Sequence, residues 1–156
     1  MSKGYTLYGM RGGAMICLSS NEEIAEEFKK VCEQSCRGTW SNCTRAAQAL
    51  ISKVHENPAL LKKVEEERAG FRETLLERGR AFEKGANECG LKIIPYDGGF
   101  FASIPCDQPE KVVDELMNEG IFLVPLSKGI RVAVSALSLE KLIMIPARVK
   151  AAMEKC

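Results

Sequence analysis

The sequence lacks the features that would direct a protein to a membrane or a nucleic acid. Its longest apolar runs, such as residues 121–126, fall far short of the ~20 residues that span a bilayer. Lysine and arginine number 22 against 21 acidic residues, so no excess positive charge favours nucleic acid or an anionic membrane. The first residues lack the basic stretch and apolar segment of a signal peptide. We therefore expect a cytoplasmic protein with no nucleic-acid or membrane partner.

The residues that usually build a metal site are also scarce or badly spaced. The chain has one histidine, His55, and seven cysteines without a C-x-x-C pair. Cys32 and Cys36 share a helical face, but together they supply only two ligands. We predict no metal site and expect free, mostly buried thiols; metal binding or a disulfide is the alternative.

The apolar pattern of the first half predicts one short strand and three helices. Residues 14–18 form a continuous apolar run, typical of a strand buried on both faces. Ser20 or Asn21 then caps a helix that Gly38 ends or interrupts. A second helix extends to about residue 54. A long helical pattern then covers residues 58–87; it could form a coiled coil, but its apolar spacing keeps no sustained heptad.

After Gly90 the pattern changes to short strands and helices. Strands are predicted at residues 91–94, 100–104, 121–124 and 130–136, and helices at about residues 107–117 and 138–156. We therefore predict an α/β fold class. The length of 156 residues suits one domain or two partial ones.

A lysine and an arginine stand in a glycine-punctuated run at the start of the chain, MSKGYTLYGMRGG. Lys3 can form a Schiff base with a carbonyl, and Arg11 can bind a phosphate through two parallel hydrogen bonds. Gly12 and Gly13 allow the backbone to approach closely. Pyridoxal phosphate carries both an aldehyde and a phosphate. The alternative is two ordinary surface cations, while Tyr8 between them either hydrogen-bonds near the cofactor or merely packs.

A third basic residue, Arg131, is embedded in the apolar segment KGIRVAVSA of residues 128–136. A charge at the start of an apolar strand requires an anionic partner, and a guanidinium fits a carboxylate with two hydrogen bonds. An α-carboxylate would meet that requirement. The alternative is an arginine on an edge strand that reaches solvent.

Four motifs together resemble the class I pyridoxal-phosphate-dependent aminotransferases. Ser2-Lys3, with Arg11 and Gly13 downstream, resembles the lysine motif of that family. The other three are RGTWSN at 37–42, similar to a loop of the aspartate and aromatic aminotransferases, YDGGFF at 96–101, similar to a strand that lines the site, and IRVAVSA at 130–136. Each motif alone is weak, but four in the family's order indicate kinship.

The resemblance implies a fold, a reaction and a set of site residues. The fold is pyridoxal-phosphate fold type I, usually a homodimer with shared active sites. The reaction moves an amino group between an amino acid, such as aspartate, glutamate or an aromatic one, and a 2-oxo acid. Lys3 corresponds to the catalytic lysine that binds the cofactor and Arg11 to the residue that holds its phosphate. Arg131 corresponds to the α-carboxylate ligand, Arg37 to the arginine that meets a distal carboxylate across the subunit boundary, and Phe100 to an aromatic residue near substrate.

The family elements that precede the lysine have no counterpart here, among them the aspartate paired with the pyridine nitrogen. The chain thus resembles a carboxy-terminal portion: a large-domain remnant (1–55), a connecting helix (56–90) and a small α/β domain (91–156). We expect weak cofactor binding and negligible turnover from the isolated chain. One alternative is a non-catalytic folded domain that acts in association. Another is a phosphate- or nucleotide-binding module, although both glycine-rich nucleotide motifs are absent.

Overall fold

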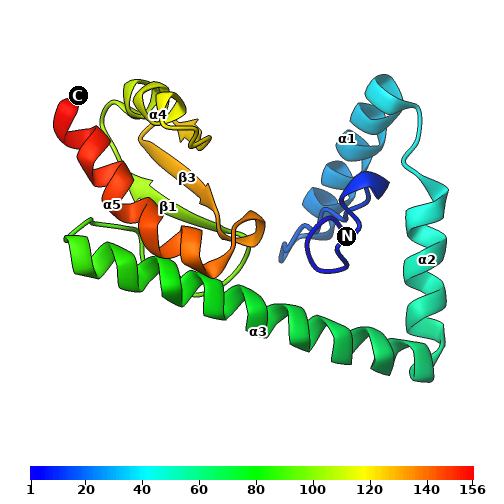
Figure 1. Cartoon of the computed structure of the whole chain (residues 1–156). Coiled ribbons are helices and arrows are strands. Elements are labelled where there is room, and N and C mark those ends of the chain that lie inside the picture. The colour runs from blue at the N-terminus through cyan, green and yellow to red at the C-terminus, as the bar shows by residue number, and fades with distance from the viewer. The chain divides into compact units, whose positions relative to one another are not determined.

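The computed structural model describes residues 1–156 and divides into two compact units, Met1–Arg68 and Ala69–Cys156. The first unit holds a single 3-10 turn, two helices and the start of a third (Figure 1): η1 (Tyr8–Met10), α1 (Glu22–Trp40), α2 (Arg45–Glu56) and α3 (Pro58–Cys89). The second unit holds the rest of α3 and the following elements: β1 (Phe101–Pro105), α4 (Pro109–Asn118), β2 (Val124–Leu126), β3 (Gly129–Ala133), η2 (Val134–Ala136) and α5 (Leu139–Lys155).

Helix α1 begins where the sequence predicts, because Asn21 caps it. The Asn21 side chain accepts a hydrogen bond of 2.8 Å from the backbone N–H of Glu23. The prediction that Gly38 ends or interrupts the helix is wrong, since α1 continues to Trp40. One glycine costs a helix only ~1 kcal/mol, which the rest of the helix can offset.

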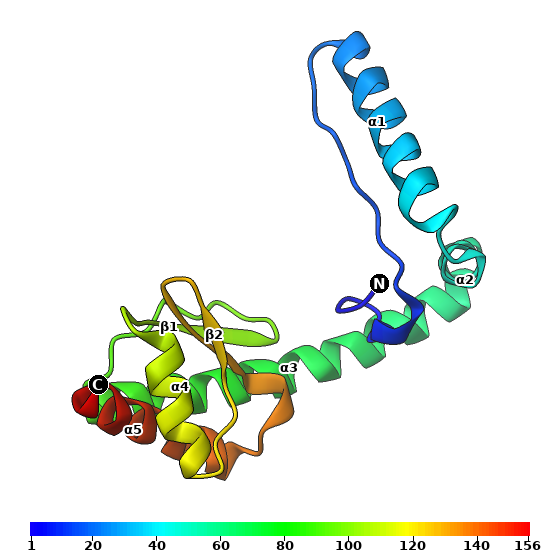
Figure 2. The same ribbon diagram turned by 90° about the horizontal axis from the view of Figure 1, so that it is seen from above.

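The strand predicted at residues 14–18 is not formed. The segment has no regular secondary structure and passes beside α1 (Figure 2), and the side chains of Met15, Ile16 and Leu18 are 76%, 80% and 95% exposed. A strand needs a neighbour to pair its backbone N–H and C=O groups. All three strands of the structure lie in the second unit, so this segment has none.

The first unit has almost no core of its own. Only Ala47 and Val54, both on α2, are buried among residues 1–68. Helix α1 has no buried residue, although Ile24, Val31 and Trp40 project from it. The packing that stabilises this chain is therefore concentrated in the second unit.

The second unit is built on a three-stranded antiparallel sheet with strand order β1-β3-β2. The strand predicted at 91–94 does not form, although the N–H of Ile94 donates to the carbonyl of Ser103 at 2.9 Å. The strand predicted at 121–124 is displaced to β2, and the one predicted at 130–136 ends at Ala133, where η2 takes over.

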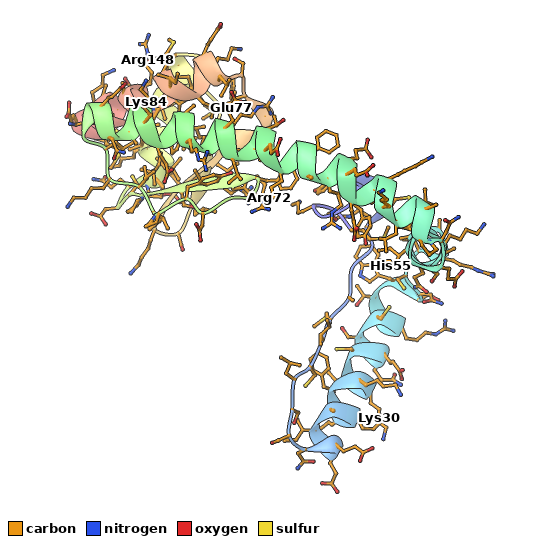
Figure 3. All side chains as sticks on the ribbon, turned by 90° about the horizontal axis from the view of Figure 1, so that it is seen from below. Lys30, His55, Arg72, Glu77, Lys84 and Arg148 are labelled. Carbon is orange, nitrogen blue, oxygen red and sulfur yellow. The ribbon has the colours of Figure 1, made fainter.

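One face of this sheet carries the core. Alternation along the strands turns Ala102, Ile104, Ile130 and Val132 to the buried side, where they pack with residues of three helices. Those helical residues are Phe82 and Ala86 of α3, Val112, Val113 and Leu116 of α4, and Leu142, Ile145, Val149 and Ala152 of α5. Charged side chains are exposed along α3, among them Arg72, Glu77 and Lys84 (Figure 3).

Close contact between two of these helices depends on a glycine. A Cβ placed on Gly85 of α3 would lie 2.4 Å from the carbonyl oxygen of Ile143 in α5. Real Cβ contacts are not that short, so a side chain at this position would push α5 away. Gly85 therefore sets the separation of α3 and α5.

The seven cysteines are free, and only Cys106 is buried. The prediction of mostly buried thiols is thus wrong, because Cys17, Cys32, Cys36 and Cys43 belong to the unit that has almost no core. No group of histidine, cysteine and acidic residues is placed to hold a metal ion. None of the helices has the length and apolar character needed to cross a membrane.

Candidate functional site

Lys3 and Arg11 converge on the ring of Tyr8. The Lys3 Nζ lies 4.9 Å from the ring centroid, and the guanidinium carbon of Arg11 lies 4.6 Å from it. Both distances are within the range of cation–π attraction. The Tyr8 ring is 63% exposed, and both cations reach the surface. Two groups that the sequence separates by eight positions are thereby held at one place.

The backbone of residues 1–13 closes into a loop that sustains this convergence. The amino-terminal ammonium of Met1 donates to the carbonyl of Gly12 at 3.1 Å. The guanidinium of Arg11 donates to the carbonyl of Tyr8 at 3.0 Å. Thr6 and Arg11 have φ values of 52° and 49°, a region that costs a non-glycine residue about 1–3 kcal/mol. Two such residues on either side of Tyr8 mark a loop that the surrounding contacts hold in a strained form.

Contacts with α2 and α3 anchor the loop. The hydroxyl of Tyr5 is hydrogen-bonded to Nε2 of His55 at 2.9 Å, and the guanidinium carbon of Arg68 lies 5.3 Å from the Tyr5 ring centroid. A Cβ on Gly12 would lie 2.7 Å from the Cβ of Ala47. Only a glycine at position 12 therefore lets the loop pack this closely against α2. Sequence analysis did not identify Tyr5 or His55, because their pairing joins positions 50 residues apart.

Arg37, predicted to meet a distal carboxylate, lies near the end of α1. Its Nη1 donates to the Ser41 Oγ at 2.8 Å and to the Ser41 carbonyl at 3.4 Å. The side chain is exposed and also lines a groove of about 860 Å³ with Phe28 and Asn42. These bonds help to terminate α1, as a basic residue in the last turn commonly does.

Arg131, predicted to bind an α-carboxylate, lies on β3, the central strand of the sheet. The alternative of an edge-strand arginine is therefore wrong. Its register partners are Ser103 on β1 and Val124 on β2, and its guanidinium carbon lies 4.6 Å from the centroid of Phe101. The side chain is half-buried on the face of the sheet opposite to the core. A planar cation thus stands on an apolar surface where it can meet a carboxylate.

Phe101, rather than Phe100, is the aromatic ring on Arg131. Alternation along β1 places Phe101 and Ser103 on the same face as Arg131. The rings of Phe100 and Phe101 are 6.4 Å apart, so Phe100 lies beside this pair. The sequence shows two adjacent phenylalanines of which only one can share a face with the arginine, and the strand register decides which.

Tyr96 fixes the turn that leads into β1. Its hydroxyl lies 2.6 Å from the carbonyl oxygen of Gly99 and 3.2 Å from that of Leu75, and the two carbonyls share its single proton, which ties the turn to α3. Burial, and secondly the nearby carboxylate of Glu83, raises the pKa of Tyr96 above its ordinary value. A tyrosine hydroxyl is protonated at neutral pH even with its ordinary pKa of 10.0, so the raised pKa extends its role as a donor to more alkaline pH. Arg78, on the same helix α3, donates to the carbonyl of Ser135 at 2.7 Å.

The structure thus groups four of the predicted residues into two local sites and leaves the fifth, Arg37, by itself. Lys3 and Arg11 share the ring of Tyr8 in the first unit, where Arg37 occupies a separate position at the end of α1. Phe100 and Arg131 lie in the second unit, where the ring of Phe101 contacts both of them.

Comparisons with known proteins point to one family. The family model described as aminotransferase class I and II matches residues 1–147. An aminotransferase from Anaerococcus prevotii is 40% identical, with a TM-score of 0.84, over 99% of this chain. This chain spans 38% of that protein's length. No curated protein sequence matches the chain.

Two more distant structures share the fold. A broad-specificity aminotransferase from Leishmania mexicana has a TM-score of 0.67 at 19% identity, covering 98% of this chain and 38% of its own. An aromatic aminotransferase from Pyrococcus horikoshii has a TM-score of 0.62 at 19% identity, covering 97% of this chain and 41% of its own. The predicted fold class, part of an α/β fold type I aminotransferase, is confirmed.

Proposed function

Because the chain belongs to the class I and II aminotransferase family, we propose that it takes part in pyridoxal-phosphate-dependent transfer of an amino group from an amino acid to a 2-oxo acid. The observation that carries this proposal is the convergence of the Lys3 amine and the Arg11 guanidinium on Tyr8. An amine that condenses with an aldehyde and a cation that grips a phosphate are what this cofactor requires of a protein.

The chemistry of the donor set fits the cofactor. Lys3 and Arg11 are both exposed in one short loop, and Gly12 and Gly13 leave its backbone without side chains next to the arginine. When bound, pyridoxal phosphate supplies an electron sink for the carbon that bears the amino group. Lys3 would hold the cofactor through its aldehyde carbon, and Arg11 would neutralise its phosphate.

Lys3 would have a second role as an acid–base group. Its amine, when free, would take the proton from the α-carbon of the substrate as a general base and later return a proton as a general acid. Arg131 would orient the substrate by binding its α-carboxylate. Phe100 would lie against the substrate, and Arg37 would meet the distal carboxylate of a dicarboxylic substrate bound in a partner subunit.

The proposed function also implies a domain organisation and an oligomeric form. We take residues 1–55 as part of the cofactor-binding large domain, 56–90 as the connecting helix and 91–156 as the small domain. The working form would be a cytoplasmic homodimer that accepts an amino acid, dicarboxylic or aromatic, and a 2-oxo acid. Since this chain spans 38% of the Anaerococcus protein, we expect it to turn over negligibly by itself.

Reconstitution with pyridoxal phosphate tests the cofactor site. We expect a visible absorption band in the wild-type chain that is lost in Lys3→Ala. Lys30→Ala is the matched control, because Lys30 is an exposed lysine on α1 of the same unit (Figure 3). A band that survives Lys3→Ala, or is lost equally in Lys30→Ala, would refute the role of Lys3.

A second candidate function is a non-catalytic association unit. The exposed apolar side chains of the first unit favour it, since Met15, Ile16 and Leu18 are mostly in solvent and only Ala47 and Val54 are buried there. Mixing the chain with a polypeptide comprising the remaining large domain of the Anaerococcus relative separates the two candidates. A complex that gains transaminase activity supports the catalytic proposal, whereas a stable complex without activity supports association alone.

A further inference from the structure

We propose that Tyr8 is a positioning residue, whose ring holds the Lys3 amine and the Arg11 guanidinium together so that one cofactor molecule can meet both. The proposal rests on the proposed function and deepens it. The resemblance to aminotransferases gave roles to Lys3 and Arg11 and left Tyr8 open between a polar contact and simple packing.

The shared ring is the first argument. Two like charges repel each other, so a lysine and an arginine side chain do not stay close together unless another group attracts both. Here the Nζ of Lys3 is 4.9 Å and the Cζ of Arg11 is 4.6 Å from one centroid. The negative face of an aromatic ring attracts both cations without neutralising either.

The backbone of Arg11 supplies the second argument. Its φ of 49° is unfavourable for a residue with a Cβ, and the turn Tyr8–Met10 that precedes it is only three residues long. In this conformation the N–H and the guanidinium of Arg11 both reach back to the carbonyl of Tyr8, at 3.4 Å and 3.0 Å. The strained turn thus directs Arg11 onto the residue whose ring also carries Lys3.

Tyr8 is poorly placed to serve as core. Its ring is 63% exposed, and no residue of η1 is buried. An exposed ring adds little to the stability of the fold, so its replacement should leave the fold intact. The effect of a substitution should instead appear in the two cations.

Nuclear magnetic resonance of the reductively methylated chain tests the position of Lys3 without any cofactor. Isotope-labelled methyl groups keep the lysine charge, and an aromatic ring shields nuclei above its face. We expect one methyl resonance, identified by its loss in Lys3→Arg, to be shifted away from the other lysines. The shift should persist in Tyr8→Phe, which keeps the ring, and disappear in Tyr8→Leu. Circular dichroism of both variants establishes that each is folded.

Equilibrium dialysis with pyridoxal phosphate tests the consequence for binding. The loss of a cation–π contact at an exposed site corresponds to about a two- to fivefold change, so Tyr8→Leu should weaken binding by about that factor for each cation. Tyr8→Phe should bind within about twofold of wild type. In an Arg11→Ala background, Tyr8→Leu should weaken binding by a smaller factor, because one of the two cations that contact the Tyr8 ring is already absent.

The two experiments fail separately. A wild-type chain that binds no pyridoxal phosphate refutes the cofactor site of the proposed function, and the methyl resonance still decides whether Tyr8 holds Lys3. An unshifted Lys3 resonance in wild type, or one that Tyr8→Leu does not move, overturns the positioning role. Equal binding losses in Tyr8→Phe and Tyr8→Leu would overturn it as well, since they would assign the effect to the hydroxyl.

Discussion

The guanidinium carbon of Arg131 lies 4.6 Å from the centroid of the Phe101 ring, across two strands of one sheet. The pair is diagonal in the β1–β3 register, with Ser103 opposite the arginine. The ring shields one side of the cation from water and leaves its remaining donors for a carboxylate. The sheet thereby presents a pre-oriented arginine on a face that the helices do not cover.

Replacement of Phe101 tests this relationship. Phe101→Leu keeps an apolar side chain but removes the ring, and we expect a loss of about 0.5–1 kcal/mol in the free energy of unfolding. Urea denaturation measures this loss, and the Nε–H resonance of Arg131 should move in the same variant. Phe100→Leu is the matched control, as it leaves the ring on Arg131 in place. Equal shifts of the Arg131 resonance in both variants would contradict the assignment to Phe101.

Two of the three glycines of α3, Gly70 and Gly85, should respond to replacement by alanine in opposite directions. A Cβ at Gly70 meets nothing within 4 Å, so Gly70→Ala should stabilise by up to ~1 kcal/mol through helix propensity. A Cβ at Gly85 would lie 2.4 Å from the Ile143 carbonyl oxygen. Gly85→Ala should therefore destabilise by about 1–3 kcal/mol, because a backbone atom must move. Thermal denaturation of the two variants tests this prediction, and each serves as the control for the other because the same substitution is made on the same helix. A stabilised Gly85→Ala would show that α5 is not held against this position.

The sequence predicted those parts of the fold that local signals control. Asn21 begins α1, and Pro58 begins the long α3, because a cap or an N1 proline acts within one turn of the helix. Residues 14–18 were predicted wrongly, since their apolar composition suits a strand but pairing depends on other segments. Arg131 was identified as a site candidate, whereas its ring partner depends on the register of β1 against β3, which no local pattern specifies.

An ion pair between α4 and α5 should make stability depend on pH in a defined direction. The hydrogen bond from Lys155, and then its charge, lowers the pKa of Glu115 below the ordinary 4.5, and the same contact raises the pKa of Lys155 above 10.5. A depressed carboxyl pKa contributes stability above pH 4.5, and this contribution is lost as the pH falls through the folded-state value. A raised lysine pKa contributes stability below pH 10.5, lost as the pH rises through its folded-state value.

Glu115→Gln removes the charge and with it this dependence. The melting temperature should be lower than that of wild type at pH 7, and the difference should shrink at acid pH below 4.5 and in molar salt, since both partners are at the surface. Glu154→Gln, on the same helix as Lys155, is the control for the loss of one negative charge. A difference that stays constant from pH 7 to pH 3 would exclude the ion pair as its cause.

The unequal burial of the two units predicts an unequal resistance to local opening. Amide exchange reports the free energy of each opening, which follows the apolar contacts that opening disrupts. Helix α1 has no buried residue, whereas α5 buries Leu142, Ile145, Val149 and Ala152. We expect the amides of α1 to exchange orders of magnitude faster than those of α5, measured by hydrogen exchange with mass spectrometry.

Helix α3 contains its own control, because one continuous helix passes from the first unit into the second. Its three glycines, Gly70, Gly79 and Gly85, lower the helix propensity of the later part, but its buried residues, Gly79, Phe82, Gly85 and Ala86, also lie there. Protection should therefore rise along the helix, low over residues 58–68 and high over residues 79–86. Tertiary packing, rather than helix formation itself, would then be what stabilises the chain. Uniform protection along α3 would contradict this, and would mean that the first unit is stabilised by contacts beyond the two residues it buries.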